Sequence, residues 1–515
     1  MRAAHSVDRP PIAWRLLLGL ALVKLAIHAL SGWLLAWGYM TDELYFLDSV
    51  DHLDWGFVDH PPLSIAVLAA VRALLGESLP AIRLLPALLG AATVVLTGIL
   101  AREMGGGRTA QGVAALAALA CPVYLALSNY YSMNAIEQFL WPLGMLIVVR
   151  IIGGDSPWWW IALGGLMGVG LLNKVSMLWF GGGLAVGLLL TPERRWLRTP
   201  WPWLAAVIAL ASFSPYVWWN AQHDWPFLEF SRNAAELKVG ARSPLDFLLQ
   251  QALSMGPTAV PLCVGGLIFA FTSRSLRPYR PLAWLFVAVA TLLAASGSAR
   301  PHYLAPAFPI VFAAGGRWVE RLATRRRLGW VPGVAVGVLT GGLLVAWPLT
   351  IPLLTPAATV RYQDALAIRP PEELERGGLL PMYLGLYLHA DALLKPLLTV
   401  YRGLPSEEQT RVEILTNSFG DTGAVNVLGR PLGLPRAIGR HNTYWLWGPG
   451  AATGDLMIVV SGNEDELHAW FESCDKRAAI DCPYCMEQMA AQALYVCRHT
   501  RRSLSELWPA LKVYR

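Results

Sequence analysis

The chain has 515 residues, of which 55% are hydrophobic and only 15% are charged. Soluble domains carry about a quarter of charged residues, so this composition excludes an ordinary soluble protein. The net charge is +6, but residues 355–515 contain 16 basic and 18 acidic side chains. The positive excess therefore belongs to the apolar part of the chain. Membrane loops explain it better there than a nucleic-acid partner, and we expect no such partner.

Apolar runs recur from Trp14 to Leu354 and then stop. Because a bilayer core of about 30 Å needs roughly 20 apolar residues per helix, these runs predict about eleven transmembrane helices. Residues 355–515 have charges throughout and no run that could span, so we expect a membrane domain at 1–354 and a soluble domain at 355–515. The predicted helices lie at 14–39, 80–101, 108–128, 136–152, 157–172, 175–190, 201–218, 247–271, 281–297, 303–320 and 329–353.

Basic residues are divided unevenly between alternate loops of this topology. The richer set includes the N-terminal segment, the pair Arg102 and Arg108, and the run Arg317 to Arg327. By the positive-inside rule this set is cytoplasmic, which puts the N-terminus inside and the C-terminal domain outside. Lys24 and His28 lie one turn apart within the first helix. They could be functional, snorkel toward the cytosol, or contact a neighbouring helix.

The first outer loop opens with two adjacent carboxylates. Asp42 and Glu43 stand where the first helix meets the outer water, and Asp59-His60-Pro61-Pro62-Leu63 follows. Charged groups at a bilayer boundary are costly unless they are paired or used. The alternative is that the two carboxylates cap a helix in headgroup water. Residues 63–75 are apolar but too few to span, which is typical of an interfacial helix.

Other polar side chains lie in the predicted outer loops. Lys174 and Arg300 are basic residues on the side where such residues are scarce, so they could bind a phosphate, Arg300 through two parallel hydrogen bonds. Contact with lipid headgroups is the alternative. Glu137 opens an apolar helix, where it could bind substrate or complement the helix dipole. Further candidates are Asn134, His223, Asp224, His302 and Tyr303.

These motifs together resemble a known family. An acidic pair after the first membrane helix, followed by Asp59-His60-Pro61-Pro62-Leu63, looks like the protein O-mannosyltransferases and the bacterial aminoarabinose transferases. Segments 215–227 and 439–449 are similar to bacterial members of this family. The resemblance spans nearly the whole chain and implies the GT-C fold, an all-α polytopic membrane domain with interfacial helices in its first outer loop. It also implies a donor sugar linked to a polyprenyl phosphate, at a bacterial-type inner membrane.

The resemblance implies a role for each carboxylate of the pair. We expect Asp42 to act as general base on an acceptor hydroxyl or amine, with Glu43 as a positioning neighbour. Direct displacement with one base would invert the anomeric configuration. A retaining mechanism is not expected, because adjacent carboxylates rarely flank a substrate as that mechanism requires. His60 and His302 could bind phosphate or satisfy loop carbonyls. The expected substrate-binding residues are Asp59, His60, Asn134, Glu137, Lys174, His223, Asp224, Arg300, His302 and Tyr303.

The sequence leaves open whether the protein depends on a metal ion. The acidic and histidine residues of the outer loops could form an oxygen and nitrogen site for a divalent metal. No tight ligand spacing such as HExxH appears, and a departing lipid phosphate needs less electrophilic help than a nucleotide diphosphate. We therefore expect no obligatory metal and no other cofactor.

The C-terminal domain is predicted to be a small α/β domain. Residues 411–416 and 455–460 favour strands, and residues 424–432 favour a helix between them. Near the end, Cys482-Pro483-Tyr484-Cys485 resembles a thiol redox motif or half a zinc site. Structural disulfides are favoured outside the cytoplasm, and their pairing stays open. The candidate cysteines are Cys474, Cys482, Cys485 and Cys497.

The main alternative is a transporter or flippase of lipid-linked precursors, which would also have many helices and charged groups in the membrane. Such a protein would not need a large soluble tail or an acidic pair ahead of His60-Pro61-Pro62, and clear internal repeats are absent. We expect inverting sugar transfer at the outer face of the membrane. The expected partners are a polyprenyl-phosphate-linked donor, membrane lipids, and a lipid, glycan or protein acceptor.

Overall fold

The computed structural model describes residues 9–515 except 35–36, 155, 240–241, 326 and 369–376. The chain divides into two compact units that are each discontinuous in sequence. The helical unit contains Met1–Leu34, Pro80–Trp219 and Ala241–Leu353. The mixed unit contains Leu35–Leu79, Asn220–Gly240 and Leu354–Arg515.

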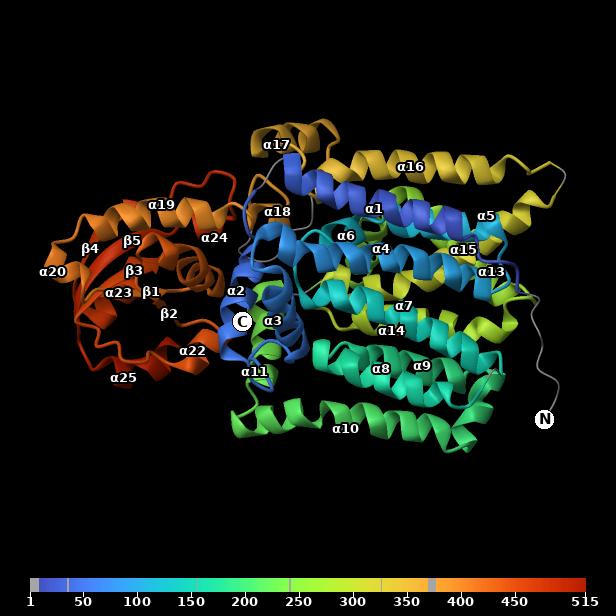
Figure 1. Cartoon of the computed structure of the whole chain (residues 1–515), viewed down its shortest axis with the longest axis horizontal. Coiled ribbons are helices and arrows are strands. Elements are labelled where there is room, and N and C mark those ends of the chain that lie inside the picture. The colour runs from blue at the N-terminus through green and yellow to red at the C-terminus, as the bar shows by residue number, and fades with distance from the viewer. Residues whose placement is uncertain (1–8, 35–36, 155, 240–241, 326, 369–376) are drawn as a thin grey trace. The chain divides into compact units, whose positions relative to one another are not determined.

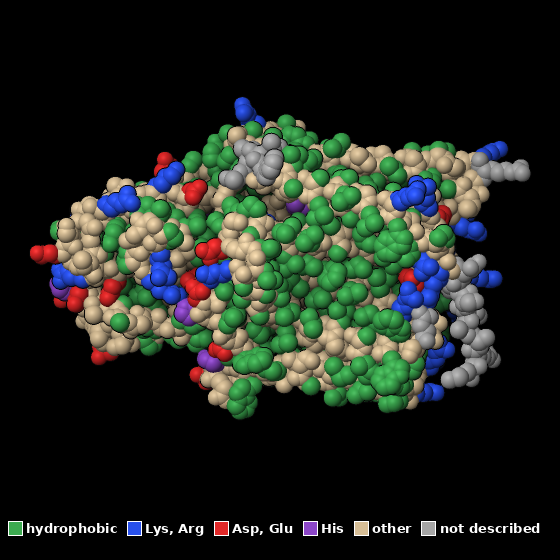
Figure 2. All heavy atoms as spheres, in the orientation of Figure 1, with side chains coloured by type: hydrophobic (Ala, Val, Ile, Leu, Met, Phe, Trp, Pro, Cys, Tyr) green, Lys and Arg blue, Asp and Glu red, His purple; other side chains and the backbone are tan. Residues whose placement is uncertain are grey.

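The helical unit is built of apolar helices that follow the eleven predicted segments (Figure 1). Among the described residues, six helices are long and apolar enough to cross a bilayer, or seven when the bent pair α12 and α13 is counted as one span. Large apolar side chains such as Leu22, Val207 and Leu344 are about 60% or more exposed. Figure 2 shows this unit as mainly hydrophobic, as a lipid-facing surface requires. Its helices are α1 (Trp14–Leu34), α4 (Leu79–Glu103), α5 (Arg108–Ala120), α6 (Pro122–Leu127), α7 (Met133–Ile152), α8 (Trp159–Asn173), α9 (Met177–Leu189), α10 (Trp201–Gln222), α12 (Pro244–Met255), α13 (Val260–Thr272), α14 (Arg280–Ala295), α15 (Phe308–Ala323) and α16 (Val331–Thr350).

Two segments that were predicted as continuous helices are broken. The helix expected at 108–128 stops at Cys121, and α6 starts again at Pro122. The helix expected at 247–271 bends by 96° between α12 and α13, at Gly256 and Pro257. Proline lacks an N–H and disfavours a helical residue before it, which explains both breaks. The first helix is also shorter than predicted and ends at Leu34.

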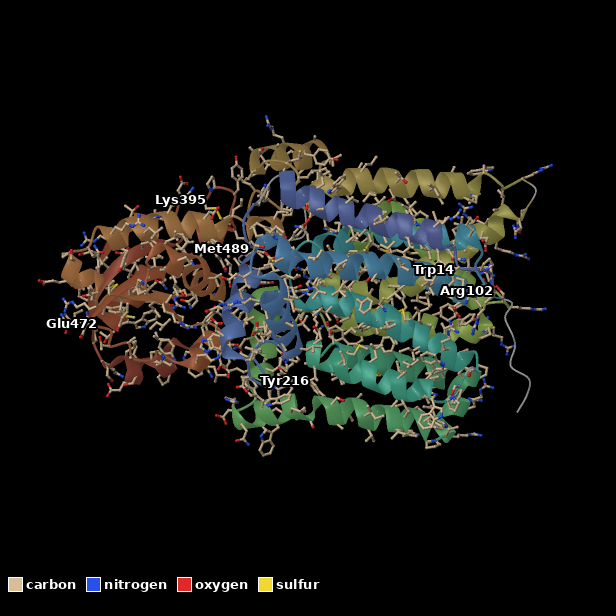
Figure 3. All side chains as sticks on the ribbon, in the orientation of Figure 1. Trp14, Arg102, Tyr216, Lys395, Glu472 and Met489 are labelled. Atoms are coloured by element: carbon tan, nitrogen blue, oxygen red, sulfur yellow. A yellow bond between two sulfur atoms is a disulfide. The ribbon has the colours of Figure 1, made fainter. Side chains whose placement is uncertain are left out.

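The basic residues of the helical unit gather at one end. Glu103, the last residue of α4, is fully buried. Its carboxylate lies 3.1 Å from Arg9, 2.6 Å from Arg102 and 3.0 Å from Arg150. Figure 2 shows Lys and Arg at this end, and Figure 3 shows Trp14 and Arg102 there. The loops that were predicted to share one side therefore meet, while the assignment of that side to the cytoplasm stays a prediction.

Lys24 is fully buried in the middle of α1. Its Nζ donates to the backbone oxygen of Tyr124 in α6 at 2.8 Å. The Tyr124 hydroxyl donates to the backbone oxygen of Ala305 at 2.7 Å. Of the three alternatives for Lys24, snorkelling is wrong, because the ammonium is held against a neighbouring helix instead of reaching the membrane surface.

The mixed unit contains a five-stranded sheet with the order β2-β1-β3-β5-β4. β1 pairs in parallel with β2 and β3, while β5 is antiparallel to β3 and β4. The sequence predicted β1, β3 and the helical turn after β1, but missed β2, which is short, β4, which is mostly exposed, and the longer buried strand β5. The strands are β1 (Glu413–Thr416), β2 (Ala437–Gly439), β3 (Leu456–Ser461), β4 (Phe471–Ala479) and β5 (Ala493–Thr500), with α19 (His389–Arg402) and α21 (Phe419–Ala424) against the sheet.

Two disulfides belong to the mixed unit. Cys474 in β4 is bonded to Cys497, its register partner in β5. Cys482 is bonded to Cys485 in the turn that joins β4 to β5. Both bonds therefore lie within one β-hairpin of the sheet.

The mixed unit also includes the first outer loop, which the sequence assigned to the membrane domain. This loop forms α2 (Thr41–Ser49) and α3 (Leu63–Leu75), and the segment after α10 forms α11 (Pro226–Asn233). The boundary at residue 354 separates the two units at that point, but it leaves out two further segments. The assignment of residues 355–515 to a soluble domain of their own therefore stays a prediction.

Candidate active site

The acidic pair lies in the first turn of α2. Glu43 is fully buried, and its carboxylate accepts a hydrogen bond from the Met40 backbone N–H at 2.9 Å. Asp42 is half-buried beside it. The two neighbours therefore differ, since Glu43 closes the start of the helix while Asp42 keeps access to solvent. A negative charge is stabilised at a helix N-terminus.

α2 is held by a close approach to α21. A Cβ placed on Gly423 would lie 2.8 Å from the carbonyl carbon of Leu44, so only glycine fits there. Beneath this contact, Asp421 is fully buried and accepts hydrogen bonds from His389 at 2.5 Å and Gln492 at 3.0 Å. The C-terminal sheet thus fixes the backbone that carries Asp42.

A hydroxyl network joins the acidic segment to the C-terminal domain. The Tyr45 hydroxyl donates to Asp59 at 2.7 Å and accepts from the Thr443 hydroxyl at 2.7 Å. The Val58 N–H donates to the same Thr443 oxygen at 3.1 Å. Burial and the Asp59 carboxylate raise the pKa of Tyr45 well above its ordinary value, so the phenol keeps its proton. Tyr45 and Thr443 were not among the predicted site residues.

His60 is fully buried. Its Nδ1 bonds to the Pro61 carbonyl at 2.9 Å, and the ring stacks on Phe57 with centroids 4.9 Å apart. Of the two alternatives for His60, the contacts favour the one in which it satisfies a loop carbonyl. The Nε2 atom is buried and has no hydrogen-bond partner among the described residues, so the phosphate-binding alternative stays a prediction.

His223 and Asp224 lie in a tight turn between α10 and α11. Asp224 and Trp225 both have left-handed backbone angles, with φ of 59° and 56°. Non-glycine residues adopt this region rarely and at a cost of order 1–3 kcal/mol each. The Trp225 N–H donates to the Asn220 carbonyl at 2.8 Å and closes the turn. Asp224 and Trp225 are exposed, and His223 is half-buried.

The helical unit has its own polar cluster. Lys174 follows α8, and its Nζ donates to Glu137 and to Asn134 at 2.7 Å each. The Ser176 hydroxyl donates to the other oxygen of Glu137. Asn173 donates to the Met133 carbonyl at 2.9 Å, which holds the end of α8 against the start of α7. Three predicted residues therefore meet, and Glu137 already neutralises the charge of Lys174.

The short 3-10 helix η6 (Pro301–Ala307) lies against this cluster. The Lys174 Nζ lies 4.9 Å from the centre of the Tyr303 ring, a cation–π contact. The ring of His302 packs edge-on against that of Tyr303, with centroids 4.8 Å apart. It interacts electrostatically with the charged groups of Lys174 and Arg300. Arg300 comes directly before η6 and is half-buried. The predicted basic and aromatic residues thus lie close to one another in the helical unit.

The predicted site residues form two groups. The mixed unit holds Asp42, Glu43, Asp59, His60, His223 and Asp224, and the helical unit holds Asn134, Glu137, Lys174, Arg300, His302 and Tyr303. No three His, Cys, Asp or Glu side chains among the described residues are arranged to hold a metal ion.

Comparison with known proteins gives three matches. The family model "Dolichyl-phosphate-mannose-protein mannosyltransferase" matches residues 59–219. The lipid A galacturonosyltransferase RgtD of Rhizobium johnstonii is 25% identical over 270 residues, which are 52% of this chain and 56% of RgtD. The crystal structure of ArnT from Cupriavidus metallidurans bound to undecaprenyl phosphate aligns with a TM-score of 0.61 at 15% identity, over 94% of this chain and 98% of ArnT.

The chain has the GT-C fold. The apo state of the same ArnT agrees, with a TM-score of 0.58 at 16% identity over 94% of this chain and 97% of ArnT. The predicted family resemblance is confirmed by the family model, RgtD and the fold together. The matched segment spans about half the length of RgtD, the curated relative.

Proposed function

We propose that this chain is a glycosyltransferase that moves a sugar from a polyprenyl-phosphate-linked donor to an acceptor at the outer face of an inner membrane. The observation that carries the proposal is the placement of the acidic pair. Asp42 lies on a helix that buried contacts hold in place, in a chain with the GT-C fold. The ArnT structure bound to undecaprenyl phosphate supports a lipid-phosphate donor, and RgtD supports lipid A as an acceptor.

Asp42 is the proposed general base. Its carboxylate takes the proton of the acceptor hydroxyl or amine, and the acceptor atom forms a bond to the anomeric carbon of the sugar. The bond from that carbon to the phosphate oxygen breaks on the opposite side, which inverts the configuration and leaves a lipid phosphate. General bases of this kind contribute about 10²–10⁴-fold to rate.

The departing phosphate needs cations. Arg300 and Lys174 are the proposed partners, with His302 and Tyr303 beside them. Glu137 accepts a hydrogen bond from the Lys174 ammonium. We assign phosphate binding to Arg300 and Lys174 together, and the orientation of Lys174 to Asn134 and Glu137.

The distribution of charges supports a membrane orientation. We propose that the basic end around Glu103 faces the cytoplasm, with the N-terminus, and that Asp42 and the C-terminal domain are extracytoplasmic. Structural disulfides in the mixed unit agree with an oxidising compartment.

The test uses purified full-length protein with a polyprenyl-phosphate sugar and an acceptor extract. We expect Asp42→Asn to lower the turnover number by about 10²-fold or more, while binding of the donor changes little. Glu43→Gln should mainly lower the thermal stability, because the Glu43 carboxylate accepts a hydrogen bond from the Met40 N–H at the start of the helix. An Asp42→Asn protein that transfers sugar at the wild-type rate would remove the base assignment. NMR of the product linkage decides whether the configuration inverts.

A further inference from the structure

A second polar cluster lies at the far end of α2 and has no role in the mechanism above. Asp48 is buried at 5% exposure near the end of this helix. One carboxylate oxygen accepts from the Asn426 amide at 2.7 Å, and the other accepts from Arg436 at 3.4 Å. Asn426 also bonds to the backbone N–H of Ala437, next to Arg436, at 2.8 Å. The cluster therefore connects the first outer loop to the start of β2.

Arg436 is the exposed member of this cluster, with 42% of its side chain accessible. Both of its hydrogen bonds use the same nitrogen, Nη2, which contacts Asp48 and the Nε2 of His52. Within the described part of the chain, the Nη1 and Nε groups of Arg436 donate to no partner. A guanidinium has five N–H donors in a planar fork, so the Nε donor and the two Nη1 donors are left for a ligand.

The fork is held in place from the other side as well. His52 stacks on Trp447 with centroids 4.1 Å apart and planes 22° apart. Burial and the charge of Arg436 lower the pKa of His52, so its Nε2 stays unprotonated at neutral pH and accepts from Arg436. Asp48 and the His52–Trp447 stack thus orient Arg436 before any ligand arrives, which reduces the entropy lost on binding.

We propose that Arg436, held by Asp48 and His52, binds a phosphate or carboxylate group of the acceptor. Because the two-bond geometries of a guanidinium all include Nη2, which already contacts Asp48 and His52, the anion accepts single charge-assisted hydrogen bonds from Nη1 or Nε. The inference rests on the proposed function, because it assigns the anion to the acceptor of that reaction.

The length of α2 separates this anion from the proposed base. Asp48 follows Asp42 by six residues, which is about 9 Å along a helix that rises 1.5 Å per residue. The leaving phosphate is bonded to the carbon that the acceptor attacks, so it belongs close to the base. A group bound at Arg436 is better placed to be a distant part of the acceptor, where it would set specificity.

Binding is tested with full-length protein in phosphatidylcholine nanodiscs, using glucose 1-phosphate as probe and ligand-observed NMR as readout. We expect binding that weakens about tenfold or more in Arg436→Gln and substantially in Arg436→Lys, since lysine keeps the charge but lacks the Nη1 and Nε donors. Arg430→Gln, another exposed arginine of the mixed unit, is the matched control and should bind as wild type does. Thermal unfolding checks that each variant is folded.

Three results would overturn the site. Equal binding by Arg436→Gln and wild type would do so, as would equal binding of glucose and glucose 1-phosphate. Loss of probe binding in nanodiscs of phosphatidylglycerol, with recovery in phosphatidylcholine, would assign Arg436 to a lipid headgroup instead of the acceptor.

Kinetics separate this inference from the proposed function. Arg436→Gln should raise the KM for an anionic acceptor about tenfold and leave the KM for the donor unchanged. A protein that transfers sugar with an unchanged acceptor KM in Arg436→Gln would overturn the acceptor assignment alone. A wild-type protein that binds the probe through Arg436 but transfers no sugar would overturn the proposed function and leave the anion site standing.

Discussion

The two units hold their polar groups in different ways. In the helical unit, buried carboxylates are paired with cations, Glu103 with three arginines and Glu137 with Lys174. In the mixed unit, Asp48 at one end of α2 pairs with Arg436, and the other contacts of this helix include hydroxyl bonds and close backbone approaches, such as Tyr45 to Thr443 and Gly423 to Leu44. An uncompensated charge costs far more next to lipid than next to water. Charge pairing should therefore contribute most to the stability of the helical unit, and close backbone packing should contribute most to the stability of the mixed unit.

The largest expected effect breaks a charge pair of the helical unit. Lys174→Ala leaves the Glu137 carboxylate, 6% exposed, without its cation, and removal of one partner of a buried pair costs about 3–5 kcal/mol. Thermal unfolding in detergent measures the loss. The double variant Lys174→Ala/Glu137→Ala should recover part of it. Equal stability of the single and double variants would contradict charge pairing as the controlling term.

A smaller effect is expected from overpacking in the mixed unit. Gly423→Ala places a methyl group 2.8 Å from the Leu44 backbone, which should cost about 1–3 kcal/mol and displace α2. Sugar transfer should fall along with the unfolding temperature. Gly462→Ala is the control, because its methyl would meet its nearest neighbour at 3.7 Å. Similar behaviour of the two variants would show that α2 tolerates movement.

The hydroxyl network should contribute less. Tyr45→Phe removes one hydroxyl and leaves Asp59 and Thr443 without that partner, at a cost of about 1–2 kcal/mol. Tyr401→Phe removes a hydrogen bond to the Gln409 carbonyl outside this network and serves as the control. Chemical denaturation compares the two. A smaller loss for Tyr45→Phe than for Tyr401→Phe would argue against a structural role for the network.

The smallest expected effect depends on pH. The pKa of His52 is lowered in the folded protein from its ordinary 6.5, so the unfolded chain binds more protons between the two values. The free energy of unfolding should therefore fall as the pH drops from 7 through 6.5 and below. The charged groups near the ring are Arg436, Asp48 and Asp51. His52→Gln should flatten this part of the profile, and an unchanged profile would contradict it.

The helical unit was predicted well because its signals are local. Each apolar run has its own length, and each loop its own arginines, so eleven segments and a basic end follow from the order of residues. The breaks at Pro122 and Pro257 were missed although proline marks both, since apolar composition continues through them. The average hydropathy of a segment depends on its side chains, so it does not change when a proline removes one backbone N–H donor.

The mixed unit was harder because its contacts join distant segments. Tyr45 meets Thr443 across 398 residues, and Asp48 meets Arg436 across 388. No local pattern marks Arg436, which follows a proline in a loop. The motifs at 59–63 and 439–449 were each noticed, but only the fold brings Asp59, Tyr45 and Thr443 into one network. The sequence found the acidic pair and missed what holds it.

The buried Lys24 has a consequence for how the protein is made. It is the eleventh of the 21 residues of α1, and a lysine at the centre of a membrane helix costs about 2.5–3.5 kcal/mol on insertion. Its carbonyl partner, Tyr124, is synthesised 100 residues later. We expect nascent α1 to be retained in a polar environment or by a helper protein until α6 emerges, so that insertion of the first helix is completed only after the third predicted span has emerged.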